Sequence, residues 1–476
     1  MRRRDFIKGT ALAAGVAAAS IGKTFGEGLH VEMTLEVSRT IATVPADFLG
    51  LGYEISSVAR PGLLSARNAV YVQLCRTLSS GGIIRVGGNT SDYASYSASA
   101  QALSSPETGP GSVVNDSVLR DLGFFLEATN WKLIWGLNLG RGTIENAVDE
   151  AKAVLAATGK NLFAFEIGNE PDLFVHRETH RKKGYGYEDY LLEYRRFRDA
   201  LRKKIPGIPF AGPDVAIATS WVSRFARDEG RDLKLMTHHY YREGQNPTSS
   251  IGKLLRPDPK LRPMLAELQA ASDYCRVPYR ICETNSFSGG GKAGVSDSFA
   301  SALWVLDFMY KLAAAQCSGV NMETGVNQLG FISSYSPIGD DEHGHFVATP
   351  EFYGMLAFAQ GTDAQLINSQ LHAGSFNVAG YATLKRDKQL CLTLVNKEST
   401  LDTIVTIKPI LPFRNGSLLR LSAPSWESKS DITFGGAMVK SDGTWCARTE
   451  ERVQASHGRV VLHLPAASAG VLIMNP

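Results

Sequence analysis

The sequence predicts an α/β protein: a (β/α)8 TIM barrel with a C-terminal antiparallel β-sandwich domain that also takes an N-terminal strand. Eight apolar strand-like runs alternate with helical patterns between residues 46 and 360. After about residue 366 only short strands follow, broken by Gly, Asn and Pro. Residues 30–45 alternate polar and apolar side chains, as in a half-exposed strand. We therefore divide the chain into a leader (1–26), an N-terminal strand (27–45), a barrel (46–360) and a β-sandwich (361–476).

Each expected element follows from its hydrophobic period. The barrel strands are expected at 48–54, 82–88, 131–138, 163–169, 208–213, 233–240, 279–283 and 319–322. The helices are expected at 71–78, 116–128, 144–157, 187–204, 221–227, 262–274 and 297–315. In the C-terminal domain, strands are expected at 390–395, 403–407, 418–422, 459–464 and 470–474.

Composition narrows the function classes. The chain of 476 residues is 44% hydrophobic and 20% charged, which is typical of a globular protein. No apolar run reaches the roughly 20 residues that span a bilayer, so no membrane span is expected. The net charge of +3 comes from the leader, and the rest of the chain is close to neutral. Nucleic-acid binding therefore has no electrostatic support.

The leader resembles a twin-arginine export signal. Arg3 and Arg4 lie in a basic head, and a short, weakly apolar run follows at 11–19. We expect cleavage between residues 19 and 27 and a periplasmic or extracellular location in a bacterium. The alternative is the basic start of a cytoplasmic enzyme. The six cysteines show no CxxC pair or zinc spacing, and we expect no structural disulfide.

Two carboxylates follow predicted strands. The apolar run 163–168 ends in Asn169, Glu170 and Pro171, and Glu283 ends the run 279–283. Parallel barrels build their sites at the carboxyl-terminal ends of their strands. Three βα units of about 30–40 residues separate the two glutamates, which places them after strands four and seven. A retaining glycosidase needs such a pair, one protonated and one ionised, about 5–5.5 Å apart. Glu170 alone could instead cap the next helix.

Neighbouring residues suit the same chemistry. Asn169 can bind the substrate 2-hydroxyl, where hydrogen bonding strengthens in the transition state. A tyrosine of the run His-His-Tyr-Tyr at 238–241 can donate its hydroxyl to Glu283, and we include Tyr240 among the candidates. A metal site on the adjacent histidines is unfavourable because neighbours on a strand face opposite ways. The glycines at 289–291 can form an anion-binding nest, or alternatively a flexible hinge.

Together these motifs resemble glycoside hydrolase family 79, which contains β-glucuronidases and heparanase. The resemblance rests on Asn-Glu-Pro at 169–171, Glu283 with its glycine loop, Gly-Pro-Asp-Val at 212–215, the run 238–241 and Arg-Val-Gly-Gly-Asn at 85–89. It implies Glu170 as acid/base and Glu283 as nucleophile.

The same resemblance implies the substrate contacts. Sugar hydroxyls would be bound by Glu54, Asn89 and Asn169. The glucuronate carboxylate would be received by the amides of Gly289 and Gly290 and by the hydroxyl of Tyr335. Ser288 departs from the family pattern, which has a tyrosine there, and this weakens the preference for glucuronate.

The resulting hypothesis is a retaining exo-β-glucuronidase that releases terminal β-linked glucuronic acid from oligo- or polysaccharides through a covalent intermediate. It implies a carbohydrate substrate and no metal or organic cofactor. Three alternatives stay open: specificity for another uronic acid or a neutral sugar, an endo-acting heparanase-like enzyme, and a catalytically inert carbohydrate-binding barrel. The lack of a Lys/Arg cluster in the loop that follows the eighth strand disfavours binding of long sulfated chains.

Overall fold

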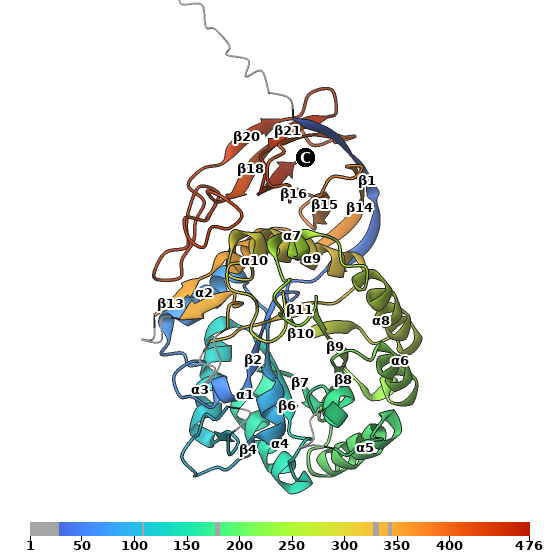
Figure 1. Cartoon of the computed structure of the whole chain (residues 1–476), viewed down its shortest axis with the longest axis vertical. Coiled ribbons are helices and arrows are strands. Elements are labelled where there is room, and N and C mark those ends of the chain that lie inside the picture. Colours follow the sequence, from blue (N-terminus) through green and yellow to red (C-terminus); the bar gives the residue numbers. More distant parts are fainter. Residues whose placement is uncertain (1–27, 107–108, 177–180, 327–332, 341–344) are drawn as a thin grey trace, which may run out of the picture.

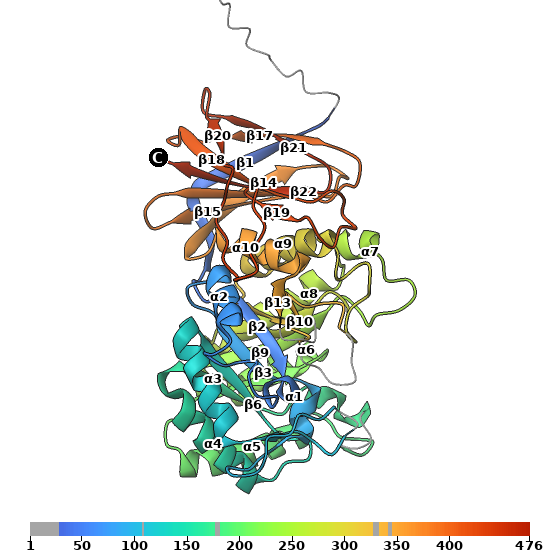
Figure 2. The same ribbon diagram turned by 90° about the vertical axis from the view of Figure 1, so that its left-hand side faces the viewer.

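The computed structural model describes residues 28–106, 109–176, 181–326, 333–340 and 345–476. The export signal expected at 1–26 lies outside the described residues. None of the helices described is both long and apolar enough to cross a membrane. Figures 1 and 2 show two bodies stacked along the long axis of the molecule, a barrel of strands and helices below and a β-sheet domain above.

Eight parallel strands form the barrel and are hydrogen-bonded in the order β7-β6-β3-β2-β11-β10-β9-β8. They are β2 (Gly50–Glu54), β3 (Ile83–Gly87), β6 (Lys132–Leu137), β7 (Leu162–Ile167), β8 (Ala211–Val215), β9 (Leu235–Tyr241), β10 (Tyr279–Asn285) and β11 (Val320–Glu323). A parallel bridge between Phe165 and Phe210 joins the two end strands and closes the ring. The predicted (β/α)8 barrel is confirmed.

Helices surround the barrel, as Figure 1 shows. The longer ones are α2 (Ala69–Leu78), α3 (Asp116–Thr129), α4 (Ile144–Thr158), α5 (Tyr187–Lys204), α6 (Thr219–Asp228), α8 (Leu261–Cys275), α9 (Phe299–Ala314) and α10 (Pro350–Ala359). Shorter elements are α1 (Ile55–Val58), α7 (Ile251–Leu255), β4 (Ser95–Tyr96), β5 (Val113–Val114), β12 (Ile338–Asp340), β13 (Phe346–Ala348), η1 (Asn89–Tyr93), η2 (Gly159–Asn161), η3 (Pro171–His176) and η4 (Gly230–Asp232). Helix α5 is typical: one apolar face is buried, acidic residues begin it and basic residues end it, which complements the helix dipole.

The second body is a ten-stranded, mostly antiparallel sheet. Its strands are β1 (Leu29–Val44), β14 (Ala364–His372), β15 (Val378–Lys385), β16 (Leu390–Asn396), β17 (Thr403–Lys408), β18 (Asn415–Ser422), β19 (Thr433–Phe434), β20 (Glu451–Gln454), β21 (Val460–Leu464) and β22 (Ser468–Asn475). The expected N-terminal strand is present as β1, which pairs antiparallel with β14 and parallel with β17. Met33, Leu392, Leu462 and Leu472 share one buried core, so β1 and β21 pack over β16 and β22 as in a sandwich.

Helices α9 and α10 lie between the barrel and the sheet domain, as both views show. Asp307 of α9 accepts hydrogen bonds from Lys311 (2.7 Å), from Tyr381 of β15 (2.5 Å) and from Lys397, which directly follows β16. Burial raises the pKa of Asp307, but Lys397 and Lys311 outweigh it and hold that pKa below its usual value. This ion cluster ties the sheet domain to the barrel.

Candidate active site

The carboxyl ends of the barrel strands open into a cavity of about 770 Å³. Its walls include most of the predicted site residues, namely Glu54, Asn89, Glu170, Tyr240, Glu283, Gly289 and Tyr335. Asn169 and Gly290 are neighbours of these residues in sequence but do not line the cavity. The structure therefore brings the two glutamates, which are far apart in sequence, into one site.

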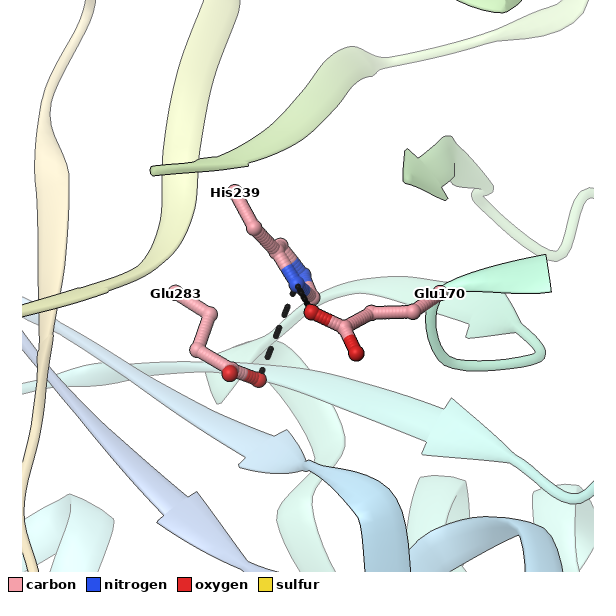
Figure 3. A group of neighbouring side chains, drawn as sticks. All are labelled: Glu170, His239 and Glu283. Atoms are coloured by element: carbon pink, nitrogen blue, oxygen red, sulfur yellow. Dashed lines mark hydrogen bonds and ion pairs between the residues drawn. The ribbon is translucent and has the colours of Figure 1, made fainter. Parts of the chain in front are cut away.

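Glu170 and Glu283 face each other across this cavity. Glu170 follows β7 with a left-handed backbone (φ 50°), and its amide donates to the carbonyl of Asp214 at 2.9 Å. Glu283 lies within β10. One oxygen of each carboxylate and a nitrogen of His239 all lie within 4.8 Å of one another. Figure 3 shows the His239 ring beside both carboxylates.

A β-bulge aims Glu283 into the barrel. Ile281 pairs with His238 of β9, but Glu283 pairs with His239, so Cys282 is an extra residue in β10. Side chains alternate along a strand, and the extra residue turns Glu283 to the side of His239. A matching bulge lies at Asp214 in β8, which has φ 60°. Such bulges re-aim side chains next to active sites.

Arg85 of β3 is fully buried and holds the floor of the site together. Its guanidinium donates to Glu283 (2.8 Å), Asn169 (2.8 Å), Glu166 (3.1 Å) and Asp214 (2.5 Å). Removal of a charge from water is costly unless it is paired, and these four contacts compensate that cost. The guanidinium places a positive charge beside the Glu283 carboxylate.

The His239 ring contacts three carboxylates, those of Glu170, Glu283 and Asp214. Its Nδ1 lies 3.1 Å from Glu170 and 3.8 Å from Glu283, and its Nε2 lies 2.8 Å from Asp214. Burial lowers the pKa of His239, but Asp214 and Glu283 outweigh it and raise that pKa well above its usual value. An imidazolium has no lone pair for a metal ion. With both ring nitrogens protonated, His239 joins Glu170, Glu283 and Asp214 in one ion-paired network.

The tyrosine that contacts the nucleophile candidate is Tyr241. Its hydroxyl donates to Glu283 at 3.1 Å. Tyr240 lines the cavity, but its hydroxyl donates to Asp258 at 2.7 Å, and its ring stacks on Phe308. Of the two tyrosines in the run 238–241, Tyr241 is thus the partner of Glu283, because successive side chains of β9 point to opposite faces. Substrate binding by Tyr240 remains a prediction.

Glu54 is engaged by the loop that follows β3. One of its oxygens accepts from the Asn89 amide (3.0 Å), and the other accepts from the amide (2.8 Å) and hydroxyl (2.5 Å) of Thr90. Burial, and then the charge of Glu283, raise the pKa of Glu54 to about 7. The amide nitrogen of Asn169 donates to Asn89 at 3.4 Å. Roles of these three residues in sugar binding remain predictions.

Glu323, at the end of β11, is a further acid of the cavity. It is buried, and burial together with Glu283 and Glu54 raises its pKa well above the usual range. Gly52 makes room for it, since a Cβ there would lie 2.8 Å from the Glu323 carboxylate. Glu54, Glu283 and Glu323 thus form one acidic wall.

The glycine loop forms the rim beside this wall. Gly289, Gly290 and Gly291 all have left-handed backbones (φ 79°, 88° and 77°), which glycine adopts without strain. Among the described residues, the amides of Gly289 and Gly290 donate no backbone hydrogen bond. The buried Tyr335 ring stacks on Tyr241, with centroids 6.1 Å apart.

Sequence reasoning assigned no role to five residues of this site: Arg85, Glu166, Asp214, His239 and Glu323. A signal was present for Arg85 and Glu166, because each is a charged residue inside an apolar strand and must find a partner within the barrel. No comparable signal marked Glu323 among the acidic residues.

Solved structures share the architecture. A 4-O-α-L-rhamnosyl-β-D-glucuronidase from Fusarium oxysporum 12S matches 93% of this chain and 100% of its own with a TM-score of 0.74 at 18% identity. A family 51 arabinofuranosidase from Xanthomonas axonopodis pv. citri matches 94% of this chain and 100% of its own, with a TM-score of 0.64 at 14% identity. These identities establish the fold alone: that of (β/α)8 glycoside hydrolases with an added sheet domain.

Sequence similarity indicates a narrower class of protein than the shared fold does. No family model matches the chain. A curated β-glucuronidase from Aspergillus niger is 26% identical over 347 residues, which cover 66% of this chain and 63% of the relative. A second β-glucuronidase, from Neurospora crassa, is 28% identical over 313 residues, which cover 58% of this chain and 55% of the relative. The match thus spans about three fifths of these relatives. The chain is similar to β-glucuronidases, and the expected resemblance to glycoside hydrolase family 79 is confirmed.

Proposed function

We propose that the protein is a retaining exo-β-glucuronidase. The observation that carries this proposal is the pair of carboxylates, Glu170 after the fourth barrel strand and Glu283 on the seventh, with oxygens within 4.8 Å in one cavity. Separations near 5 Å accompany a covalent intermediate, whereas inverting enzymes leave room for a water between carboxyl groups about 6.5–9.5 Å apart.

In the first step the Glu283 carboxylate attacks the anomeric carbon while Glu170 protonates the departing glycosidic oxygen. The products are a glycosyl ester of Glu283 and the free alcohol. In the second step the Glu170 carboxylate takes a proton from water, whose oxygen displaces Glu283 from the sugar. Arg85 and Tyr241 hold Glu283 ionised and oriented, and His239 positions Glu170.

Three features support glucuronate as the sugar. The curated relatives at 26% and 28% identity are β-glucuronidases. The amides of Gly289 and Gly290 and the hydroxyl of Tyr335 can donate to a carboxylate at the rim. The raised pKa values of Glu54 and Glu323 favour the uncharged forms of these two acids, which limits repulsion of an anionic sugar.

The test is hydrolysis of p-nitrophenyl β-D-glucuronide by the wild type, Glu283→Gln and Glu170→Gln. We expect turnover only in the wild type, with the β-anomer of glucuronic acid formed first in the NMR spectrum. Equal turnover by Glu283→Gln would remove Glu283 as nucleophile, and an α-anomer formed first would exclude retention. If the wild type is folded but inactive, a panel of other aryl glycosides decides between another sugar and an inert carbohydrate-binding barrel.

We also propose export through the leader. Arg3 and Arg4 support it, as the paired arginines of a twin-arginine signal. Replacement of both by lysine should move the protein from the exported fraction to the cytoplasm, and an unchanged distribution would contradict the proposal.

A further inference from the structure

Side chains from both faces of β9 line the cavity, and we call the part of it beside His238 and Tyr240 the lobe. His239 and Tyr241 point towards the catalytic carboxylates. Residues in alternate positions of a strand face the other way. His238 and Tyr240 also line the cavity, together with Arg242 just beyond the strand. One strand therefore serves two compartments, the carboxylate site on one face and this lobe on the other.

The walls of the lobe are mainly apolar. The first two turns of α8 present one face, because residues three and four apart are neighbours on a helix, and this face includes Pro263 and Met264. Opposite lie Leu173 and Ile217. Ile217 is 72% exposed, so its side chain is accessible to a bound molecule at the cavity rim.

The exposed isoleucine is held in place. Asp172, two residues after Glu170, accepts from the amides of Ala216, Ile217 and Ala218, each at 2.9 Å. The next residue, Thr219, donates to Glu267 of α8 at 2.5 Å. The apolar rim is therefore a fixed surface, attached to the segment that carries Glu170.

Most polar groups of the lobe are already used. Thr219 and Glu267 bond to each other, and Arg242 donates to the carbonyl of Arg256 at 2.8 Å. Two polar side chains of the lobe differ among the described residues: Lys260, which is exposed, and His238, which is 2% exposed and makes no hydrogen bond with either ring nitrogen. A sugar ring would need partners for several hydroxyls and would favour an aromatic platform. An apolar molecule needs neither.

The position of the lobe identifies its occupant as the leaving group. Leu173 lies one turn after Glu170, since its amide donates to the Glu170 carbonyl at 2.8 Å. The glycine rim and Tyr335 lie instead with the acidic wall around Glu283. Glu170 protonates the oxygen of the leaving group, so the compartment that begins at Glu170 receives that group.

We infer that this lobe binds an apolar alcohol, alkyl or aryl, as the leaving group, with its oxygen at Glu170 and its hydrocarbon part against Leu173, Ile217 and Met264. The inference rests on the proposed glucuronidase activity. It assigns small apolar glucuronides, rather than glucuronyl sugars, as the preferred substrates.

The test uses methyl, butyl and octyl β-D-glucuronides, whose alcohols leave with similar ease, so that differences in kcat/KM report binding of the chain. Full burial of one methylene corresponds to about fourfold. We expect butyl to exceed methyl by at least about tenfold. Ile217→Ser and Met264→Ser should each lower that ratio by about threefold or more. Leu401→Ser, at a 44% exposed leucine of the sheet domain, should keep the wild-type ratio.

The outcomes separate the two proposals. Equal kcat/KM for methyl and butyl glucuronide in an active wild type would overturn the apolar lobe and leave the glucuronidase proposal standing. An unchanged ratio in both serine variants, or faster cleavage of a glucuronyl disaccharide than of butyl glucuronide, would also overturn it. No turnover of any glucuronide by folded protein would refute the activity itself.

Discussion

Tyr241→Phe is the sharpest perturbation of the proposed nucleophile. The substitution removes one oxygen, and with it the 3.1 Å hydrogen bond from the phenol to Glu283. Glu283 keeps its contact with Arg85 at 2.8 Å, and the Tyr335 ring remains stacked against position 241. The change therefore isolates a single contact without emptying the site.

A hydrogen bond to a charged group contributes about 1.5–3 kcal/mol. If that contact orients Glu283 for attack, its loss lowers kcat/KM on the order of 10- to 100-fold. The measurement is steady-state hydrolysis of p-nitrophenyl β-D-glucuronide, with thermal unfolding recorded alongside. The fall in kcat/KM should exceed anything explained by the change in Tm.

Tyr187→Phe is the matched control. Its hydroxyl donates to Asp228 at 2.7 Å, a tyrosine–carboxylate bond on α5 outside the cavity. This variant should keep wild-type kcat/KM. If Tyr241→Phe retains more than about a third of the wild-type kcat/KM, or if the control loses as much, Tyr241 does not orient the nucleophile.

Other consequences concern stability and the acidic wall. Asp307→Asn should lower the free energy of unfolding by about 3–5 kcal/mol in urea titrations, because it leaves buried lysine charge unpaired. The stability difference between wild type and variant should be present above the usual aspartate pKa and should fade as the pH falls below about 4. Glu54 keeps its proton in the folded protein up to about pH 7, so wild-type stability falls as the pH rises from about 4.5 to 7, and Glu54→Gln should flatten that decline in Tm. Gly52→Ala should displace Glu323 and lower kcat/KM about tenfold. Gly81→Ala, where the nearest atom to a Cβ is 3.7 Å away, should not.

Hydrophobic period was sufficient to predict the barrel but not the whole sheet domain. Helix α5 has the predicted bounds, because its apolar spacing and terminal charges agree. Strands β14 and β15 were missed. In β14, Asn368, Ser369 and Gln370 interrupt the apolar pattern where the strand pairs with β1, and pairing partners cannot be read from one segment alone.

Side-chain direction was the part of the site that sequence could not supply. A strict alternation along β10 would place Glu283 on the face of Ile281, and the bulge at Cys282 reverses this. The same one-residue uncertainty left both Tyr240 and Tyr241 open as the partner of Glu283. The carboxylates themselves were predictable because Glu170 follows a buried strand, Glu283 lies near the end of another, and a barrel brings all such ends together.

The carboxyl groups of the cavity differ in charge because of the cations beside them. Asp214 contacts both Arg85 and His239, and these cations lower its pKa despite burial. Glu54 and Glu323 lie on the other side of Glu283, and burial with the charge of Glu283 raises the pKa of each. A covalent bond to the sugar would remove that charge, and so would weaken the force that keeps the two acids protonated. The ionisation of Glu54 and Glu323 is thus coupled to the charge on Glu283, while Arg85 and His239 lower the pKa of Asp214 on the opposite side.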